Sequence, residues 1–537
     1  GMVVAQGRLD EVVPLEPAAM ANRTVIQWDK DDCADLGIIK IDLLGLGMLD
    51  ALEQAIPMIR DHEGVDLDLA HLPPDDEPTY EMIRAADTAG VFQIESRAQM
   101  ASLPRNKPRH FYDLVVQVAI IRPGPIAGNM TNPYLERRQG REPVTYPHPS
   151  LEPVLERTLG VPLFQEQLLR IAMVAAGFSG GEAEELRRAM GFKRSRERMV
   201  AIEAKLRRGM TLKGIDAKAQ DEIVQAITSF ALYGFPESHS ASFALIVYAS
   251  AYLKRHHPTA FYASLLNAWP MGFYHPATLV KDGQRHGVDF RSVDVNRSGW
   301  RCRWEEGAVR IGLRYVHGLK QTVGETIERE QAVRPFADTA DLTGRCGLSS
   351  EQLERLAHVG ALGSLGLTRR EALWQVAEVV GRDGSLFAKL PPEPSSPLPE
   401  MTELETTVAD YSGLHLTTGP HLMSYLRPEL ERRGAVPVSA LESMPDDAPV
   451  RVAGAVIVRQ RPGTARGFVF LTMEDETGMV QAIIRPDLFR EHRPFLVSTP
   501  VILVEGTLQK TDGTLSVKAQ RFEKVEAEAE VESHDWC

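Results

Sequence analysis

Two residues near the start of the chain, Lys40 and Asp42, have the types and the spacing to hold a metal ion beside a phosphate. They lie in the run IIKID (38–42), whose β-branched residues predict a strand, and residues two apart on a strand point to one face. A carboxylate is a ligand for Mg²⁺, and a neighbouring ammonium neutralises phosphate oxygens. An ordinary ion pair at a strand edge explains the same spacing, and the spacing alone favours that simpler interpretation.

The glycines that follow, Gly45 and Gly47, raise the alternative of a dinucleotide-binding turn. That turn needs Gly-x-Gly-x-x-Gly directly after a strand, with an acidic residue about 20 positions further on. Asp50 stands where the third glycine should be, and Asp42 precedes the turn instead of following it. The pattern therefore disfavours a dinucleotide site.

A strongly basic block is the second candidate for phosphate chemistry. Residues 187–213 contain ten Lys or Arg and two Glu, whereas the last dozen residues of the chain are acidic. A solvated helix face and a phosphate-binding surface are about equally supported by this block alone. The formal net charge of −13 argues weakly against nucleic acid, but the distribution of charge matters more than its total.

Composition limits the class of protein. The 537 residues are 43% hydrophobic and 25% charged, which is typical of a folded chain with several domains. No apolar run approaches the roughly 20 residues that cross a bilayer. The cysteines Cys33, Cys302, Cys346 and Cys537 have no metal-ligand spacing, which disfavours a zinc site or a disulfide framework. We expect a soluble, cytoplasmic protein.

Hydrophobic periodicity then indicates the elements that must position these residues. Residues 1–58 alternate short β-like runs (MVVAQ, TVIQW, IIKID) with polar turns and enter a helix from Met48. Residues from 60 to about 270 repeat apolar positions at three and four, which predicts a mostly helical region.

The second half of the chain has a different pattern. The segment 312–327 predicts a short hairpin with Gly318 between two helical halves, and the Pro/Ser-rich segment 389–400 predicts a linker. Beyond residue 434, five β runs separated by Gly and Asp/Gly turns predict a small closed barrel, most simply an OB-fold.

Several long motifs resemble one family in the same order along the chain. They begin with MVVAQGRLDEVVPLE and QWDKDDCADLGIIKIDLLGLGMLDAL and continue through GVFQIESRAQM (90–100), VAIIRPGPIAGNM (118–130), GVPLFQEQLLRIA (160–172), LRRAMGFKR (186–194) and YGFPESHSASFALIVYASAYLKRHHP (233–258). By these motifs the chain resembles the bacterial C-family DNA polymerases, the DNA polymerase III alpha-subunit family.

The resemblance implies a multidomain α+β fold. Its expected parts are the C-terminal part of a polymerase-beta-like palm (1–58), mostly α-helical fingers (59–272), a helix-hairpin-helix domain (273–366), a linker with a degenerate clamp-binding motif (367–433), a C-terminal OB-fold β-barrel (434–525) and an acidic tail (526–537).

By the same resemblance, Asp42 is the third carboxylate of a palm site that holds two Mg²⁺ ions. The other two carboxylates belong to an upstream Asp-x-Asp motif that this sequence does not contain. Asp66 and Asp68 also form an Asp-x-Asp, but they follow Asp42 and are expected to be turn and helix-cap residues. The family's amino-terminal PHP domain and thumb are missing as well, so we expect a C-terminal fragment that does not polymerise alone.

The resemblance also implies a nucleotide site. Its expected members are Lys40, Arg122 of RPGP, Arg187 and Arg188 of LRRAM, Lys193, and Ser238, His239 and Ser240 of ESHSASFA. The forked guanidiniums of Arg187 and Arg188 suit triphosphate oxygens better than lysine would. For His239, a neutral hydrogen-bonding histidine at a helix start is the competing interpretation. Gln93 and Glu95 also match the family and are expected to be structural.

DNA contacts are expected further along. A helix-hairpin-helix binds the duplex backbone through amides near its glycine, which points to Gly318 with Lys320 beside it. In the predicted barrel, Arg459, Arg461 and Arg466 stand out as basic and would contact a single-stranded template.

The branch of the family is the last expectation. Replicative members carry a clamp-binding Gln-x-x-(Leu/Met)-Phe peptide, whereas here Asp383 stands at the glutamine position before Leu386 and Phe387. Losing that glutamine's hydrogen bonds costs about 1–3 kcal/mol of affinity. The chain also ends soon after its barrel, at SHDWC, as do error-prone, damage-inducible members.

We therefore expect part of a translesion polymerase that uses dNTPs and a DNA primer–template. In that branch, mutasome-type partner proteins supply the sliding-clamp contact. A replicative alpha subunit and a non-catalytic DNA-binding or scaffold module are the alternatives.

Overall fold

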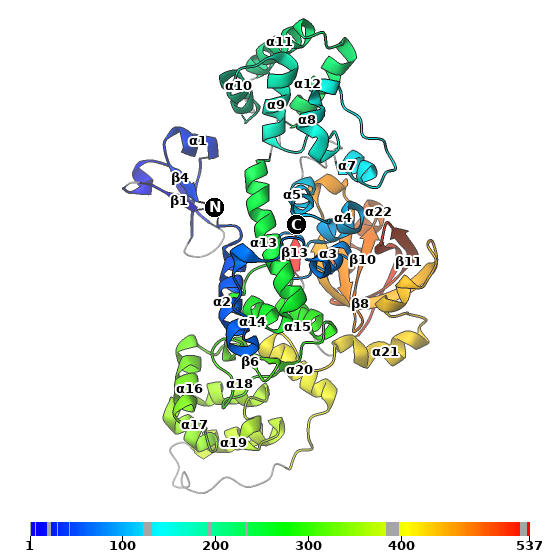
Figure 1. Cartoon of the computed structure of the whole chain (residues 1–537). Coiled ribbons are helices and arrows are strands. Elements are labelled where there is room, and N and C mark those ends of the chain that lie inside the picture. Colours follow the sequence, from blue (N-terminus) through cyan, green and yellow to red (C-terminus); the bar gives the residue numbers. More distant parts are fainter. Residues whose placement is uncertain are drawn as a thin grey trace.

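A computed structural model describes residues 2–5, 7–18, 23–28, 30–41, 43–121, 131–191, 196–230, 235–382, 397–526 and 534–536. The chain passes from small N-terminal strands through a long helical body to a C-terminal β-barrel (Figure 1). The fold is mixed α+β and mostly helical, as the sequence predicts. None of the helices in the described part of the chain has the length and apolar character needed to cross a membrane.

The N-terminal strands form two separate pairs. β1 (Met2–Val4) pairs antiparallel with β4 (Ile39–Ile41), and β2 (Leu15–Pro17) pairs with β3 (Thr24–Ile26). A short helix, α1 (Lys30–Asp35), precedes β4. The three predicted runs are thus strands, and β2 is an additional strand that the alternation did not indicate.

Gly45 turns the chain from these strands into α2 (Leu46–Glu63) with a left-handed φ of +97°. A Cβ there would lie 3.3 Å from the ring of Phe92, so both the conformation and the space favour glycine. α2 then packs on α14 (Pro258–Ala268) in the centre of the helical body.

The longest helix, α13 (Glu237–His256), runs through the helical body and links an upper group of helices to a lower one (Figure 1). It contacts α5, α3, α2 and α14 and buries residues along most of its length. The other helices of this body are α3 (Glu77–Arg84), α4 (Arg97–Asn106), α5 (Phe111–Ile120), α7 (Thr131–Arg138), α8 (Glu152–Leu155), α9 (Gln165–Ala176), α10 (Gly180–Gly191), α11 (Arg196–Leu212), α12 (Ala217–Phe230) and α15 (Pro276–Arg285).

Below this body lies a small sheet followed by helices. The sheet has the order β5 (Phe290–Arg291), β7 (Ala308–Arg310), β6 (Arg303–Glu305). The helices are α16 (Gln321–Val333), α17 (Thr339–Cys346), α18 (Ser350–His358) and α19 (Arg369–Arg382).

The first half of the predicted 312–327 hairpin is only a 3-10 turn, Leu313–Tyr315. The reason is tertiary: Arg314 donates to the backbone carbonyls of Asn267 and Trp269, and Tyr315 donates to that of Leu266 over 2.8 Å. These bonds satisfy carbonyls at the C-terminal end of α14, and they hold residues 313–315 against it.

Much of the segment predicted as a linker is helical. Besides α19, it contains α20 (Glu403–Leu414) and α21 (Leu422–Arg432). Thr402 and Glu405 form a capping box at the start of α20, and Arg369 donates to the buried Asp410 over 2.6 Å. The Pro/Ser-rich segment between these helices led the whole region to be predicted as a linker, although the sequences on both sides of it carry helix signals.

The C-terminal region is a closed five-stranded barrel, as predicted. Its elements are β8 (Pro449–Gln460), β9 (Val469–Glu474), β10 (Met479–Ile484), α22 (Pro486–Ser498), β11 (Val501–Thr511) and β12 (Thr514–Lys524). Pairing of β11 with β8 closes the barrel, and β10 with β12 is its parallel pair. In the expected acidic tail, β13 (His534–Trp536) adds in parallel to β8.

Candidate nucleic-acid interface

Several predicted site residues fall where the structure gives no side chain. Asp42, Arg122, Lys193 and the clamp-motif positions Asp383, Leu386 and Phe387 lie outside the described residues. Lys40 is on β4, in register with Val3 of β1, and Arg187 and Arg188 are on α10, described by backbone alone. Their roles stay predictions.

The helix that carries Arg187 and Arg188 is held firmly at its start. Glu182 in the first turn of α10 accepts a bond from Lys205 of α11 over 2.5 Å and one from the backbone N–H of Ser179 over 2.7 Å. The Lys205 ammonium, helped by Ser179, lowers the pKa of Glu182 to about 2. These bonds fasten the first turn of α10, the helix that carries Arg187 and Arg188, to α11 and to Ser179.

The three residues at the start of α13 have different environments. Ser238 is exposed, and His239 is half-buried with its ring centroid 4.2 Å from that of Phe243. Ser240 is fully buried, and its hydroxyl donates to the carbonyl of Val115 over 2.6 Å. Ser240 thus joins α13 to α5, an arrangement that favours a structural role, whereas Ser238 and His239 lie nearer the surface.

A cavity of about 590 Å³ lies beside this helix start, and the sequence did not indicate it. The guanidinium carbon of Arg157 lies 3.5 Å from the ring centroid of Tyr112, whose hydroxyl donates to Glu237 over 2.8 Å. Burial raises the pKa of Tyr112, so this hydroxyl stays protonated at neutral pH. The cavity combines an aromatic ring, a cation and a hydrogen-bonded acid at the end of α13.

Glu95 of the FQIES motif has the surroundings of a structural residue, which is the role the sequence predicts. Its carboxylate accepts backbone N–H bonds from Gly90 over 3.0 Å and Phe273 over 2.8 Å. Burial raises the pKa of Glu95 to about 7, although these two bonds work in the opposite direction. The carboxylate fastens the turn before α4 to the chain after α14.

Gly318 occupies a turn that favours glycine. Its φ is +75°, and a Cβ would collide with the guanidinium of Arg355, which donates to the carbonyl of His317 over 2.5 Å. Gly318 and Lys320 are both exposed. Arg355, which the motif did not indicate, adds a second cation to this turn from 38 positions away.

The barrel arginines divide by environment. Arg459 donates to the carbonyls of Leu496 (2.9 Å) and Thr499 (2.8 Å), so it caps the end of α22. Arg461 and Arg466 are exposed, and the Arg461 guanidinium lies 5.3 Å from the ring centroid of Phe489.

These barrel residues border a cavity. It measures about 600 Å³, and its lining includes Arg459, Arg461, Phe489 and Arg493. Arginines beside an aromatic ring suit stacked bases and their phosphates. The sequence pattern did not indicate Phe489 and Arg493, which reach the cavity from α22.

Among the described residues, Asp87, Asp282 and His286 are the three whose possible metal-ligand atoms all lie within 4.8 Å of one another. The fully buried Lys254 already lies between them, with Nζ 3.1 Å from Asp87 and 2.9 Å from Asp282. Burial opposes its charged form, but the two carboxylates raise the pKa of Lys254. This cluster is a buried ion-pair network, and its donor set does not fit Mg²⁺, which prefers oxygen ligands.

Comparison with family models gives matches in four consecutive parts of the chain. They are the bacterial DNA polymerase III alpha NTPase domain (residues 1–45), the bacterial DNA polymerase III alpha subunit finger domain (48–214), a helix-hairpin-helix motif (287–372) and an OB-fold nucleic acid binding domain (450–525).

Curated relatives match almost the whole chain. An error-prone DNA polymerase of Anaeromyxobacter dehalogenans (strain 2CP-C) is 49% identical over 96% of this chain and 48% of its own length. Those of Mycolicibacterium paratuberculosis and Mycobacterium bovis are 47% and 46% identical over 98% and 100% of this chain, and 48% and 50% of their own lengths. The chain therefore spans about half the length of the curated relatives it matches.

Solved structures add nothing to this comparison. An asparaginyl-tRNA synthetase from Pyrococcus horikoshii is 24% identical over 17% of this chain and 23% of its own, with a TM-score of 0.15. The ordered family matches and the identity across nearly all of the sequence are decisive instead: the chain belongs to the bacterial DNA polymerase III alpha-subunit family, in which its relatives are named error-prone DNA polymerase.

Proposed function

We propose that this chain is the part of an error-prone, DNA-directed DNA polymerase that contacts the incoming nucleotide and the template, and that the whole enzyme acts in damage-induced translesion synthesis. The observation that carries the proposal is the order of NTPase-domain, finger, helix-hairpin-helix and OB-fold matches along one chain. The relatives of that name support the error-prone branch.

In this proposal the nucleotide is bound by the arginines of α10. Arg187 and Arg188 form bidentate contacts with triphosphate oxygens, and Arg122, Lys193 and Lys40 add charge around them. Glu182 supports this role, because its bonds to Lys205 and to the N–H of Ser179 fasten the first turn of the helix that carries the arginines. Ser238 and His239, at the start of α13, complete the proposed nucleotide site.

The template is contacted farther along the chain. The exposed turn at Gly318, with Lys320 and Arg355, suits the phosphates of the duplex. The barrel cavity with Arg461 and Phe489 suits an unpaired strand.

The described residues do not form a Mg²⁺ site of their own, since their closest cluster is filled by Lys254. The proposed use of magnesium depends on Asp42 together with carboxylates from polypeptide outside this sequence. We therefore propose that the chain alone does not extend a primer, and we derive no catalytic step from it. Partner proteins that supply the clamp contact, and a cytoplasmic location, are further parts of the proposal.

Binding to a fluorescent primer–template, followed by anisotropy over a salt titration, tests this function. We expect tight binding that weakens steeply with salt, because each phosphate contact releases counterions. Absence of binding even at low salt would contradict the proposal. A DNA-binding module without a nucleotide site would bind DNA but show no change on addition of dNTP.

The double variant Arg187→Ala/Arg188→Ala locates the role of α10. If these arginines serve the nucleotide, the variant keeps its affinity for the primer–template and loses the further stabilisation of the complex by dNTP. The matched variant Arg187→Lys/Arg188→Lys keeps the charge but not the forked geometry, and it should recover only part of that effect. Weaker DNA binding with a shallower salt dependence would assign the arginines to DNA phosphates instead.

A further inference from the structure

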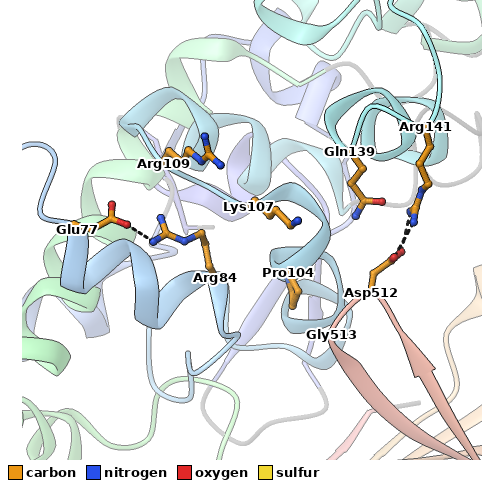
Figure 2. A pocket seen from close by; sticks show the side chains of 9 residues that line it. All are labelled: Glu77, Arg84, Pro104, Lys107, Arg109, Gln139, Arg141, Asp512 and Gly513. Carbon is orange, nitrogen blue, oxygen red and sulfur yellow. Dashed lines mark hydrogen bonds and ion pairs between the residues drawn. The ribbon is translucent and has the colours of Figure 1, made fainter. Parts of the chain in front are cut away.

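A cavity of about 780 Å³ opens where the helical body meets the barrel. Figure 2 shows it between α3, α4, the segment that follows α4, and the turn joining β11 to β12. Its lining comprises Glu77, Arg84, Pro104, Lys107, Arg109, Gln139, Arg141, Asp512 and Gly513. None of the expected nucleotide or DNA contacts lies in it.

Four cationic side chains line this cavity against two carboxylates, and the cations are of two kinds. Arg84 donates to Glu77 over 2.5 Å, and Arg141 donates to Asp512 over 2.8 Å, so both are already paired (Figure 2). The side chains of Lys107 and Arg109 are exposed, and within the described part of the chain neither has a hydrogen bond or an ion pair.

Both of these cations project from a short segment that is fixed at each end. Lys107 ends α4, where its N–H donates to Leu103 over 2.8 Å. The N–H of Arg109 donates to the buried carboxylate of Asp113 in α5 over 2.8 Å. The backbone of both residues is thus fixed, and their side chains start from a set place beside the cavity.

The backbone at Lys107 is strained, with a left-handed φ of +48°. A helix end of this conformation favours glycine, because a Cβ is unfavourable there. A lysine retained at such a position opposes local stability, and strain of this kind concentrates at functional sites. This backbone strain is an observation independent of the charge pattern, and both indicate Lys107.

The opposite wall comes from the barrel. Asp512 in the β11–β12 turn lies between Arg141 and Arg105; its bond from Arg141, with smaller contributions from the charges of Arg105 and Lys107, lowers the pKa of this carboxyl. Gly513 of the same turn sits against α4, where a Cβ added to this glycine would lie 3.1 Å from the Cβ of Pro104. A ligand in the cavity would therefore touch both the helical body and the barrel.

We propose that this cavity binds successive phosphate groups through Lys107 and Arg109. Cations without a hydrogen-bonded partner are free to bind phosphate oxygens, and the volume is in the range of sites for whole ligands, roughly 300–1,000 Å³. Two sources carry this chemistry, the backbone of a single nucleic acid strand and a free inorganic oligophosphate. The strand is the source that rests on the proposed function.

The test compares the full chain with Lys107→Ala/Arg109→Ala, using a fluorescent oligothymidylate and, separately, sodium tripolyphosphate as probes. The control is Lys218→Ala/Arg329→Ala, which removes the same charge from two exposed positions outside the cavity. For the strand, we expect at least tenfold weaker binding and a slope of log K against log salt that is smaller by about 1.4, since each lost contact removes about 0.7. In the control variant, the affinity should change by no more than about twofold and the salt slope should stay the same.

Tripolyphosphate separates the two sources. If the Lys107→Ala/Arg109→Ala variant loses tripolyphosphate binding but keeps strand binding, the cavity is assigned to free oligophosphate. If the variant loses binding of both probes, the cavity is assigned to the strand. If the parent chain does not bind the strand at all, the proposed function fails, but loss of tripolyphosphate binding in the variant still supports the cavity. Unchanged binding of both probes overturns the inference.

Lys107→Gly guards against a folding artefact. Glycine suits the left-handed backbone, so this variant should melt at a higher temperature than the parent and still bind the probe more weakly. If Lys107 instead stabilises the fold, the glycine variant should melt at a lower temperature than the parent. That result would contradict a binding role for the strained residue.

Discussion

The N-terminal strands and the C-terminal barrel are both built from β-branched runs, yet only the barrel buries them. In the barrel, β11 pairs with β12 on one side and β8 on the other, and Leu508 is fully buried in the barrel core. At the N-terminus, β1 and β4 pair over three residues, and Ile39 is 63% exposed. The same local signal therefore has two outcomes.

The number of strands that find partners explains the difference. A lone two-stranded pair is marginal in water, whereas a closed barrel satisfies every strand edge and encloses a core. The exposed apolar side chains cluster in the first 50 residues, among them Met2, Ile39, Leu44 and Leu46. In the barrel, the inner-facing residues of all five strands pack against one another.

The largest expected effect comes from opening the barrel. Gly506 lies at a bulge in β11, and a Cβ there would be 2.2 Å from the carbonyl oxygen of Lys518 on β12. Gly506→Val should cost about 4 kcal/mol or more, because backbone must move. Chemical denaturation measures this, with Gly463→Val as the control since its Cβ meets nothing within 4 Å. Equal stability of the two variants would show that the barrel does not depend on closure at this point.

A matched truncation compares the two regions directly. Leu508→Ala removes a fully buried side chain of the barrel core and should destabilise the chain by about 2–5 kcal/mol. Ile39→Ala removes an exposed one and should change stability by less than about 0.5 kcal/mol. A large loss from Ile39→Ala in urea unfolding would mean that the N-terminal strands are packed more tightly than their exposure indicates.

Acid should weaken the contact between the barrel and the helical body. Glu474 of β9 is buried and accepts a bond from Arg285 of α15 over 2.8 Å. Burial opposes its ionisation, but Arg285 and His421 outweigh burial and lower the pKa of Glu474 below its usual 4.5. The ion pair therefore contributes its full stability above pH 4.5, and this contribution is lost as the pH falls through the lowered pKa.

Hydrogen exchange in β9 between about pH 7 and about pH 3.5 measures this loss. Glu474→Gln removes the titrating group, so the variant should be less stable at neutral pH and should show a flatter dependence on pH. The same slope in parent and variant would exclude Glu474 as its origin.

The smallest expected effect on stability is the replacement of an exposed N-terminal side chain by a charge. Ile39→Lys should leave the unfolding midpoint nearly unchanged and reduce self-association, because charged strand edges resist pairing with other chains. Light scattering as a function of concentration reports this. An unchanged second virial coefficient would indicate that the apolar strands are not the source of attraction between molecules.

The sequence by itself determined the types of the elements. Alternation and turn residues predict the five barrel strands, and the period of three to four predicts the helical body. It could also have indicated α20 through the capping box of Thr402 and Glu405, which the Pro/Ser-rich run obscured. These signals are local, since each element buries one face and repeats with its own period.

Only the tertiary structure decided which side chains meet. Lys254 fills the cluster around Asp87 and Asp282, and Arg141 pairs with Asp512 across 371 positions of sequence. Arg355 reaches Gly318 in the same way, whereas the motif indicated only the glycine. Periodicity specifies the face that a residue occupies but not the distant element it will touch, because that partner is set by how whole helices and sheets pack.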